Sequence, residues 1–188
     1  MNGIRTVVDE SSKNIIIMDV FSRLIKERIV FIDDAIDDEM ANEIVAQLLY
    51  LDSLSNDIIK MYINSPGGGV TSGLAIYDTM SLIKSPIKTV GIGLVASMAT
   101  ILLMSGKERT CTPNCRIMIH ELSVGNPINP LEDIKIHFSE MNELQSILNS
   151  IISKKSNISN PEEYKRDFWM GPQQALSFGI IDYVLNGN

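Results

Sequence analysis

Residues 93–99 read Gly-Leu-Val-Ala-Ser-Met-Ala, and the residues on either side of them indicate the fold class. Upstream, residues 89–93 alternate branched residues with glycine, a pattern that favours a buried β-strand. Downstream, residues 99–104 are a run of good helix formers that fits a buried helix. Ser97 is therefore predicted to lie where a strand becomes a helix. At such a junction the first helical amides have no partner within the helix.

This position allows two roles for Ser97. The unpaired amides and the positive end of the helix dipole would stabilise an anion that forms beside the hydroxyl, as a nucleophilic serine requires. Serine is also a preferred N-cap residue, and for a serine at an arbitrary helix start the capping role is the more common one. The rest of the chain has to distinguish a nucleophile from a cap.

The order of strand, loop and helix occurs three times along the chain, which predicts right-handed crossovers and a largely parallel sheet. The predicted strands of these units are residues 28–32, 58–63 and 89–93. In such sheets the reactive groups gather at the carboxyl ends of the strands. Residues 67–69 are Gly-Gly-Gly and follow the second strand, while Ser97 follows the third. We therefore expect the glycines and the serine at one edge of a single α/β domain.

The composition argues against several classes of protein. The chain has 188 residues, 45% of them apolar, enough for one domain with a substantial core. A net charge of −7 argues against nucleic acid or an anionic membrane as main partner, because both attract clustered Lys and Arg. The 18 uncharged residues between Lys88 and Lys107 just reach the length of a membrane span, but their Gly, Ser and Thr content favours a buried strand and helix. The amino terminus lacks the features of a secretory signal, so we expect a cytoplasmic protein.

Two further features concern metals and assembly. Cys111 and Cys115 are the only cysteines and have no His beside them, so reduced thiols are favoured over a zinc site, and neither metal nor cofactor is expected. Residues 131–155 are predicted to form a long helix whose apolar positions step by three or four. That stripe could pack on another helix or belong to the core, and periodicity does not separate these possibilities.

A serine hydroxyl becomes a strong nucleophile only when a base accepts its proton, and the chain has two histidines. His137 lies within the predicted long helix, where a solvated surface position is expected. His120 follows a predicted buried strand at residues 116–119, on the edge where Ser97 should emerge. His120 is therefore the predicted base.

An imidazole base also needs an acid to hold its second nitrogen in the correct tautomer. Asp167 is followed by Phe168, Trp169 and Met170, so we expect its carboxylate to be partly buried and to require a partner. An ion pair with Arg166 is an equally acceptable interpretation of this acid.

The oxyanion of a tetrahedral intermediate requires two hydrogen-bond donors, for which we predict the amides of Met98 and Gly68. Adjacent glycines allow the backbone to approach a ligand closely. A phosphate-binding loop is the alternative, but no Gly-Lys-Ser/Thr follows the glycines. The chain order Ser, His, Asp differs from that of chymotrypsin-like, subtilisin-like and α/β-hydrolase enzymes, so a different fold is expected for such a triad.

Several motifs together resemble the ClpP family of Clp protease proteolytic subunits. They are Tyr62-Ile63-Asn64-Ser65-Pro66-Gly67-Gly68, Ala75-Ile76-Tyr77-Asp78-Thr79, residues 93–99, Met118-Ile119-His120 and Gly179-Ile180-Ile181-Asp182. Residues 21–28 also resemble the amino-terminal helix of that family, so the likeness covers nearly the whole chain.

The resemblance implies a serine endopeptidase of the ClpP/crotonase fold, an α/β architecture of stacked β-β-α units with a protruding handle helix and strand. Ser97 would be the nucleophile, His120 the base and Asp167 the orienting acid. Gly68 and Met98 would supply the oxyanion amides. An acyl-CoA enzyme of the related crotonase fold is a remote alternative, because it would use paired amides without this triad.

The same resemblance implies a substrate-binding mode and a division of the chain. Gly69 and Val70 would pair with the extended backbone of the substrate. Residues 1–188 would form one protease domain, with residues 1–20 as an axial amino-terminal arm and residues 121–155 as the handle segment.

The implied partners are other copies of the chain, an unfoldase and unfolded polypeptides. Two heptameric rings would form a tetradecamer, and a hexameric AAA+ unfoldase such as ClpX or ClpC, the only user of ATP, would deliver the substrate. Departures from the family pattern fall on assembly surfaces, with Pro127 and Pro130 in the handle and Lys165 at a usual aspartate position. They suggest as an alternative a divergent isoform that acts mainly as a structural or regulatory subunit, mixed with a second ClpP.

Overall fold

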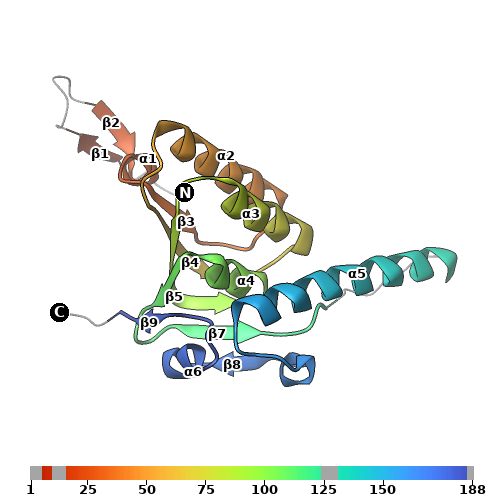
Figure 1. Cartoon of the computed structure of the whole chain (residues 1–188). Coiled ribbons are helices and arrows are strands. Elements are labelled where there is room, and N and C mark those ends of the chain that lie inside the picture. Colours follow the sequence, from red (N-terminus) through yellow and green to blue (C-terminus); the bar gives the residue numbers. More distant parts are fainter. Residues whose placement is uncertain (1–5, 10–15, 124–130, 186–188) are drawn as a thin grey trace.

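The computed structural model describes residues 6–9, 16–123 and 131–185, which form an α/β fold around one main sheet (Figure 1). The first strands are β1 (Thr6–Asp9), β2 (Ile16–Asp19), β3 (Ile29–Ile32), β4 (Ile59–Ser65) and β5 (Ile87–Ala96). The remaining strands are β6 (Glu108–Cys111), β7 (Arg116–Ile119), β8 (Phe168–Met170) and β9 (Tyr183–Val184). The helices are α1 (Val20–Lys26), α2 (Asp38–Leu54), α3 (Val70–Leu82), α4 (Met98–Ser105), α5 (Leu131–Lys155) and α6 (Pro172–Ser177), with a 3-10 helix η1 at Pro161–Tyr164.

The main sheet confirms the predicted parallel architecture. Strands β3, β4, β5, β6 and β9 lie in this order and pair in parallel, and β8 adds an antiparallel edge on β7. The long strand β5 changes partner along its length, since residues 88–91 pair with β6 and residues 94–96 pair with β7. Gly93, at φ 59°, lies between these two segments, and the Asn64 side chain accepts a hydrogen bond from the Leu94 amide beside it. This change of partner brings β7 next to the carboxyl end of β5.

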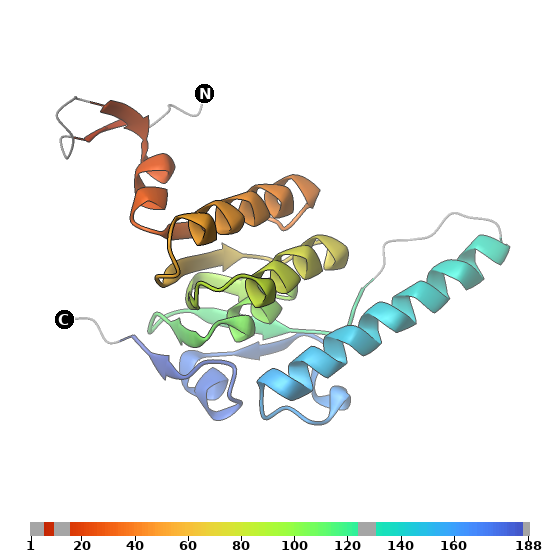
Figure 2. The same cartoon turned by 45° about the horizontal axis from the view of Figure 1, so that its top comes forward.

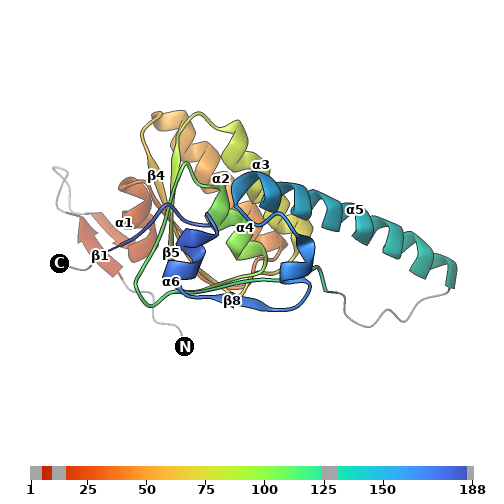
Figure 3. The same ribbon diagram turned by 60° about the horizontal axis from the view of Figure 1, so that its bottom comes forward.

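The helices pack on the sheet so that the carboxyl end of β5 lies near the carboxyl-terminal part of α5. Helices α2, α3 and α4 pack against one another in sequence order (Figure 2). Helix α4 also packs on α5, whereas α6 lies against β7, β8 and β9 (Figure 3). Helix α5 extends away from the body of the molecule in all three views.

Local signals in the sequence account for the helix boundaries. Asp37 caps α2, where its side chain accepts a hydrogen bond from the Met40 amide at 2.8 Å. The apolar face of α2 is buried and includes Ile44, Leu48 and Leu51. Toward the other end of the chain, Gly171 is the N-cap of α6 and a proline opens the helix, where its fixed φ suits the first turn.

Only the carboxyl-terminal part of the apolar stripe of α5 belongs to the core. Leu148 and Ile151, near its carboxyl end, are buried in the core, whereas Ile136 and Phe138 are 68% and 64% exposed. The handle helix expected from the family resemblance is therefore present. The expected handle strand is not seen at residues 121–123, and the rest of that segment, residues 124–130, lies outside the described residues.

The expected amino-terminal arm contains regular structure that the sequence did not reveal. Strands β1 and β2 form an antiparallel pair with Thr6 opposite Asp19. Asp19 then caps α1 by accepting a hydrogen bond from the Ser22 amide at 2.9 Å. Residues 1–5 and 10–15 of the expected arm lie outside the described residues.

The uncharged segment between Lys88 and Lys107 forms most of β5 and all of α4, and most of its residues are buried. Within the ranges that the structure describes, no helix is long and apolar enough to cross a membrane. The buried residues Cys111 and Cys115 are free thiols. A hydrogen bond that the Cys115 thiol donates to Cys111, together with burial, raises the pKa of Cys115, so this thiol stays protonated.

Candidate active site

Ser97 occupies the residue between β5 and α4, as predicted, but it does not cap the helix. Its side chain makes no capping hydrogen bond, and its Oγ lies 2.8 Å from Nε2 of His120. Its backbone is in the left-handed region at φ 54°, a conformation that costs energy for a residue with a Cβ atom. The amide of Ser97 donates to the carbonyl of Met118 at 2.8 Å, which holds this turn against β7. The capping interpretation is therefore wrong, and the hydroxyl is free to act with the imidazole.

His120 reaches Ser97 because of the register between β5 and β7. Ala96, the last residue of β5, pairs with Met118 in a parallel ladder, and β7 ends one residue later at Ile119. The carboxyl ends of both strands thus meet at the same edge, and the residue that follows each one carries a reactive side chain. The imidazole of His120 is 22% exposed. The predicted pairing of these two residues is present.

Asp167 lies beside His120 because of a second register, between β7 and β8. The last antiparallel pair is Ile119 with Phe168, so the next step along both strands brings His120 opposite Asp167. The distance from His120 Nδ1 to Asp167 Oδ1 is 3.5 Å. Among the ion pairs of the described residues, Asp167 pairs with His120 and not with Arg166.

The expectation that Asp167 is partly buried was wrong. Its side chain is 62% exposed, and Trp169, two residues later, is also exposed at 44%. Asp167 stands at the open end of the β7–β8 ladder, beyond the residues that face the core. Of its three apolar neighbours only Met170 is fully buried.

The glycine loop lies in direct contact with the Ser97 turn. A Cβ atom on Gly67 would stand 2.6 Å from the Ala96 oxygen, 2.7 Å from the Ser97 Cβ and 2.9 Å from the Met98 nitrogen, and the φ of Gly67 is +90°. A Cβ atom on Gly68 would stand 2.3 Å from the Ile36 oxygen. Both positions therefore require glycine because of close approach.

Ile36 anchors this loop, a role that sequence reasoning missed. Its amide donates to the Gly67 carbonyl at 2.9 Å, and its carbonyl accepts from the Gly69 amide at 2.7 Å. The carbonyl of Gly67 and the amide of Gly68 belong to one trans peptide and point in opposite directions. The Gly68 amide therefore points away from Ile36. The only local signal for Ile36 was the apolar pair Ala35-Ile36 between two pairs of aspartates, which does not specify a partner.

A small pocket of about 70 Å³ adjoins these groups, and Gly68, Ser97, Met98 and His120 all line it. Met98 is the first residue of α4, where helical amides lack intrahelical partners. The remaining wall is mostly apolar and comprises Val70, Ile101, Ile119, Leu122, Leu148 and Ile152, with Ser123. The pocket can thus receive a small apolar side chain beside a nucleophile, a base and backbone donors.

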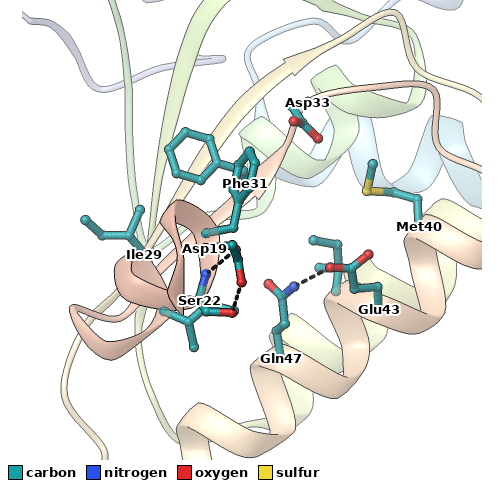
Figure 4. Close-up of a pocket in the computed structure, with 11 residues that line it drawn as sticks. Asp19, Ser22, Ile29, Phe31, Asp33, Met40, Glu43 and Gln47 are labelled. Atoms are coloured by element: carbon teal, nitrogen blue, oxygen red, sulfur yellow. Dashed lines mark hydrogen bonds between the residues drawn. The ribbon is translucent and has the colours of Figure 1, made fainter. Parts of the chain in front are cut away.

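A larger hollow of about 390 Å³ between α1, β3 and α2 lacks such a combination (Figure 4). Its serine, Ser22, is bonded through both Oγ and its amide to the carboxylate of Asp19. Gln47 donates to Glu43 at 2.9 Å along α2, on one wall of the same hollow. No histidine lines it. Elsewhere in the described residues, no group of three His, Cys, Asp or Glu side chains could hold a metal ion.

Sequence comparison relates this chain to known proteins. Residues 11–188 match the family described as Clp protease. The chain is 45% identical over 185 residues to the ATP-dependent Clp protease proteolytic subunit of Carsonella ruddii (strain PV), an alignment that covers 96% of this chain and 95% of the relative. It is 41% identical over 192 residues to the protein of the same name from Deinococcus radiodurans, covering 99% of this chain and 94% of that one.

Proposed function

The chain belongs to the Clp protease family and is a serine protease, and on that premise we propose that Ser97, His120 and Asp167 form its catalytic triad. The observation that carries this proposal is the 2.8 Å contact between Ser97 Oγ and His120 Nε2. A base at this distance can accept the hydroxyl proton as Oγ attacks the carbonyl carbon of the substrate.

The acylation step follows from the positions of these groups. His120 takes the proton from Ser97 and then gives it to the leaving amine, so that an acyl-enzyme forms on Ser97. A water molecule later hydrolyses this ester and releases the acyl part of the substrate. We assign the amides of Gly68 and Met98 to the oxyanion, where the loss of one donor typically costs about 3–4 kcal/mol of transition-state stabilisation. The outward direction of the Gly68 amide and the position of Met98 at the first turn of α4 support this assignment.

Asp167 would hold the second nitrogen of His120. The 3.5 Å between their polar atoms exceeds the usual length of a hydrogen bond, about 2.7–3.2 Å. Catalytic hydrogen bonds are often long in the absence of substrate and shorten in the complex. We therefore expect a short movement of Asp167 or His120 when substrate binds.

We propose that the substrate is an extended polypeptide, with its backbone along Gly69 and Val70 and an apolar side chain in the pocket beside Ser97. Val70 lines that pocket, and Gly69 precedes it in the anchored loop. Backbone pairing tolerates many sequences, so the small apolar pocket supplies the selectivity. No cofactor is required for this chemistry.

The proposal extends to assembly, with residues 1–188 as one protease domain. We propose that two heptameric rings enclose the sites in a tetradecamer, that an AAA+ unfoldase such as ClpX or ClpC delivers unfolded chains, and that the protein acts in the cytoplasm. The exposed apolar side chains of Ile136 and Phe138 on the protruding α5 support burial of this helix in an assembly. The names of the two relatives favour a proteolytic subunit over the alternative of a mainly structural isoform.

Replacement of Ser97 tests the triad. Ser97→Ala should abolish both peptide hydrolysis and labelling by a fluorophosphonate, because about 10⁶-fold in kcat is lost when a serine nucleophile is removed from such a triad. Ser105→Ala, which removes a hydroxyl bonded to the Ile101 carbonyl at the other end of α4, is the matched control and should keep both. Binding of CoA esters without serine labelling would instead favour the crotonase alternative. Unchanged hydrolysis by Ser97→Ala would disprove the assignment.

A further inference from the structure

The hydrogen-bond ladder between β7 and β8 stops one residue short of the proposed triad. Its last pair is Ile119 with Phe168, and both His120 and Asp167 lie outside the strands. Their 3.5 Å contact therefore depends on whatever holds the backbone beyond the ladder. The Asp167 side chain is also 62% exposed, so packing around it does not fix its place.

Two other elements hold the backbone that follows His120. The amide of Glu121 donates to the carbonyl of Tyr164 at 2.8 Å, and the amide of Leu122 donates to the side-chain Oε1 of Gln145 on α5 at 2.7 Å. Continuation of the regular ladder would have placed Glu121 opposite Arg166 instead. The chain between η1 and β8 thus leaves the sheet pattern, and these two bonds replace it.

Asn149 joins the two bonds into one network. Its Oδ1 accepts a hydrogen bond from Gln145 Nε2 at 2.6 Å and another from the Tyr164 hydroxyl at 3.0 Å. Tyr164 is 2% exposed. Burial, with the nearby charges of Glu121 and Glu163, raises the pKa of the Tyr164 hydroxyl, so the group stays protonated and donates. One oxygen on α5 therefore connects the segment after His120 with the segment before Asp167.

We propose that Asn149, through Gln145 and Tyr164, is a positioning residue that keeps His120 and Asp167 opposite each other. This inference rests on the proposed triad. Gln145 fixes the chain two residues after His120, and Tyr164 fixes the chain three residues before Asp167. Because both are bonded to the same Asn149 oxygen, they cannot move independently. Loss of that oxygen lets the two segments separate without removing any group that touches the substrate.

The experiment compares two substitutions of Asn149 that differ in one chemical property. Asn149→Leu has a similar volume but no acceptor, whereas Asn149→Asp keeps an accepting oxygen for both donors. For a fluorogenic peptide, Asn149→Leu should lower kcat about tenfold or more and leave KM nearly unchanged, since misplaced catalytic groups lower the rate at which bound substrate reacts. Asn149→Asp should retain most of the activity. The rate at which a fluorophosphonate labels Ser97 should follow kcat.

Two controls separate positioning from stability. Ile44→Val shortens a core side chain on α2 that is 1% exposed and does not line the pocket at Ser97, so it lowers Tm without touching the network. It should keep its kcat at a temperature where it is folded. Tyr164→Phe removes only the hydroxyl, and in combination with Asn149→Leu it should add little, because both changes break the same link.

Several results would overturn the inference. One is labelling of Asn149→Leu by the fluorophosphonate at the rate of the unaltered protein. Another is an equal loss of kcat in Asn149→Asp and Asn149→Leu. Asn149 would have a merely structural role if Ile44→Val loses as much activity as Asn149→Leu at the same Tm. The same conclusion would follow if the loss of activity in Asn149→Leu accompanies dissociation of the protein in sedimentation. If Ser97→Ala still abolishes labelling in these cases, the positioning role fails and the proposed triad stands. Labelling of Ser97→Ala would instead remove the triad itself.

Discussion

Substitution of Gly67 by alanine tests how closely the glycine loop must approach the Ser97 turn. The added Cβ would meet three atoms of the turn at 2.6, 2.7 and 2.9 Å, where ordinary contact begins near 3.4 Å. The loop therefore has to retreat by roughly 0.5–0.8 Å, as in other overpacked sites. The φ of +90° adds about 1–2 kcal/mol of strain, and overpacking adds about 1–3 kcal/mol. We expect the free energy of unfolding to fall by about 2–5 kcal/mol.

The same movement should impair catalysis, because the Gly68 amide belongs to the displaced loop. A shift of about 1 Å in a catalytic group can cost about 10²-fold in rate. We therefore expect kcat/KM for a fluorogenic peptide to fall about 10²-fold in Gly67→Ala. The hydrogen bonds to Ile36 restrain the loop on its other side, so it cannot retreat freely.

The assay measures peptide hydrolysis and fluorophosphonate labelling at a temperature where circular dichroism shows a folded protein. Gly171→Ala is the matched control, because its φ is −85° and the nearest atom, Arg116 Nη1, would stand 3.6 Å from the new Cβ. As an N-cap substitution it should cost at most about 1 kcal/mol and keep its activity. Activity within twofold of the unaltered protein and an unchanged Tm in Gly67→Ala would refute the requirement for close approach.

Three further predictions concern stability and reactivity. Arg28→Ala should lower the free energy of unfolding by about 2–3 kcal/mol in urea titrations, because its guanidinium donates to several carbonyls, among them that of Leu51 at 2.9 Å; a loss under 0.5 kcal/mol would contradict this role. Hydrogen bonds from Arg109 lower the pKa of Asp182. The ionised carboxylate therefore stabilises the folded protein above the ordinary pKa of about 3.9, and this stabilisation is lost as pH falls through the lowered pKa. Asp182→Asn should thus be less stable at pH 7 and equal to the unaltered protein in strong acid, whereas a constant difference would argue against the linkage. Finally, native protein should resist alkylation of Cys115 by iodoacetamide at pH 8, because a hydrogen bond and burial raise its pKa; rapid alkylation of folded protein would contradict this.

Elements with strong local signals were predictable, and short elements without such signals were not. The full extent of α5 and the presence of strands β3, β4, β5 and β7 were apparent in the sequence. Strands β1, β2, β6 and β8, of three or four residues each, were not predicted. Strands β3 and β7 also have four residues, but each contains a run of apolar residues that made it recognisable. A short segment without such a run becomes a strand only because a partner strand pairs with it.

The candidate site divides in the same way. Ser97 and His120 were recognisable because each is a reactive residue directly after a strand, and the ends of parallel strands share an edge. The choice of Asp167 rested on its apolar neighbours and the family resemblance, and the first of these grounds gave the wrong burial. Its position opposite His120 follows from the antiparallel register of β7 and β8.

The sequence by itself thus determined the repeated order of strand, loop and helix, the glycine loop, and the nucleophile and base at the strand ends, since periodicity and turn residues act over a few neighbouring positions. Only the tertiary structure decided that Asp167 faces His120 while remaining exposed, that Ile36 holds the glycine loop and that Asn149 joins α5 to both sides of the site. These contacts join residues far apart in the chain. They depend on strand register and helix packing, which no local pattern specifies.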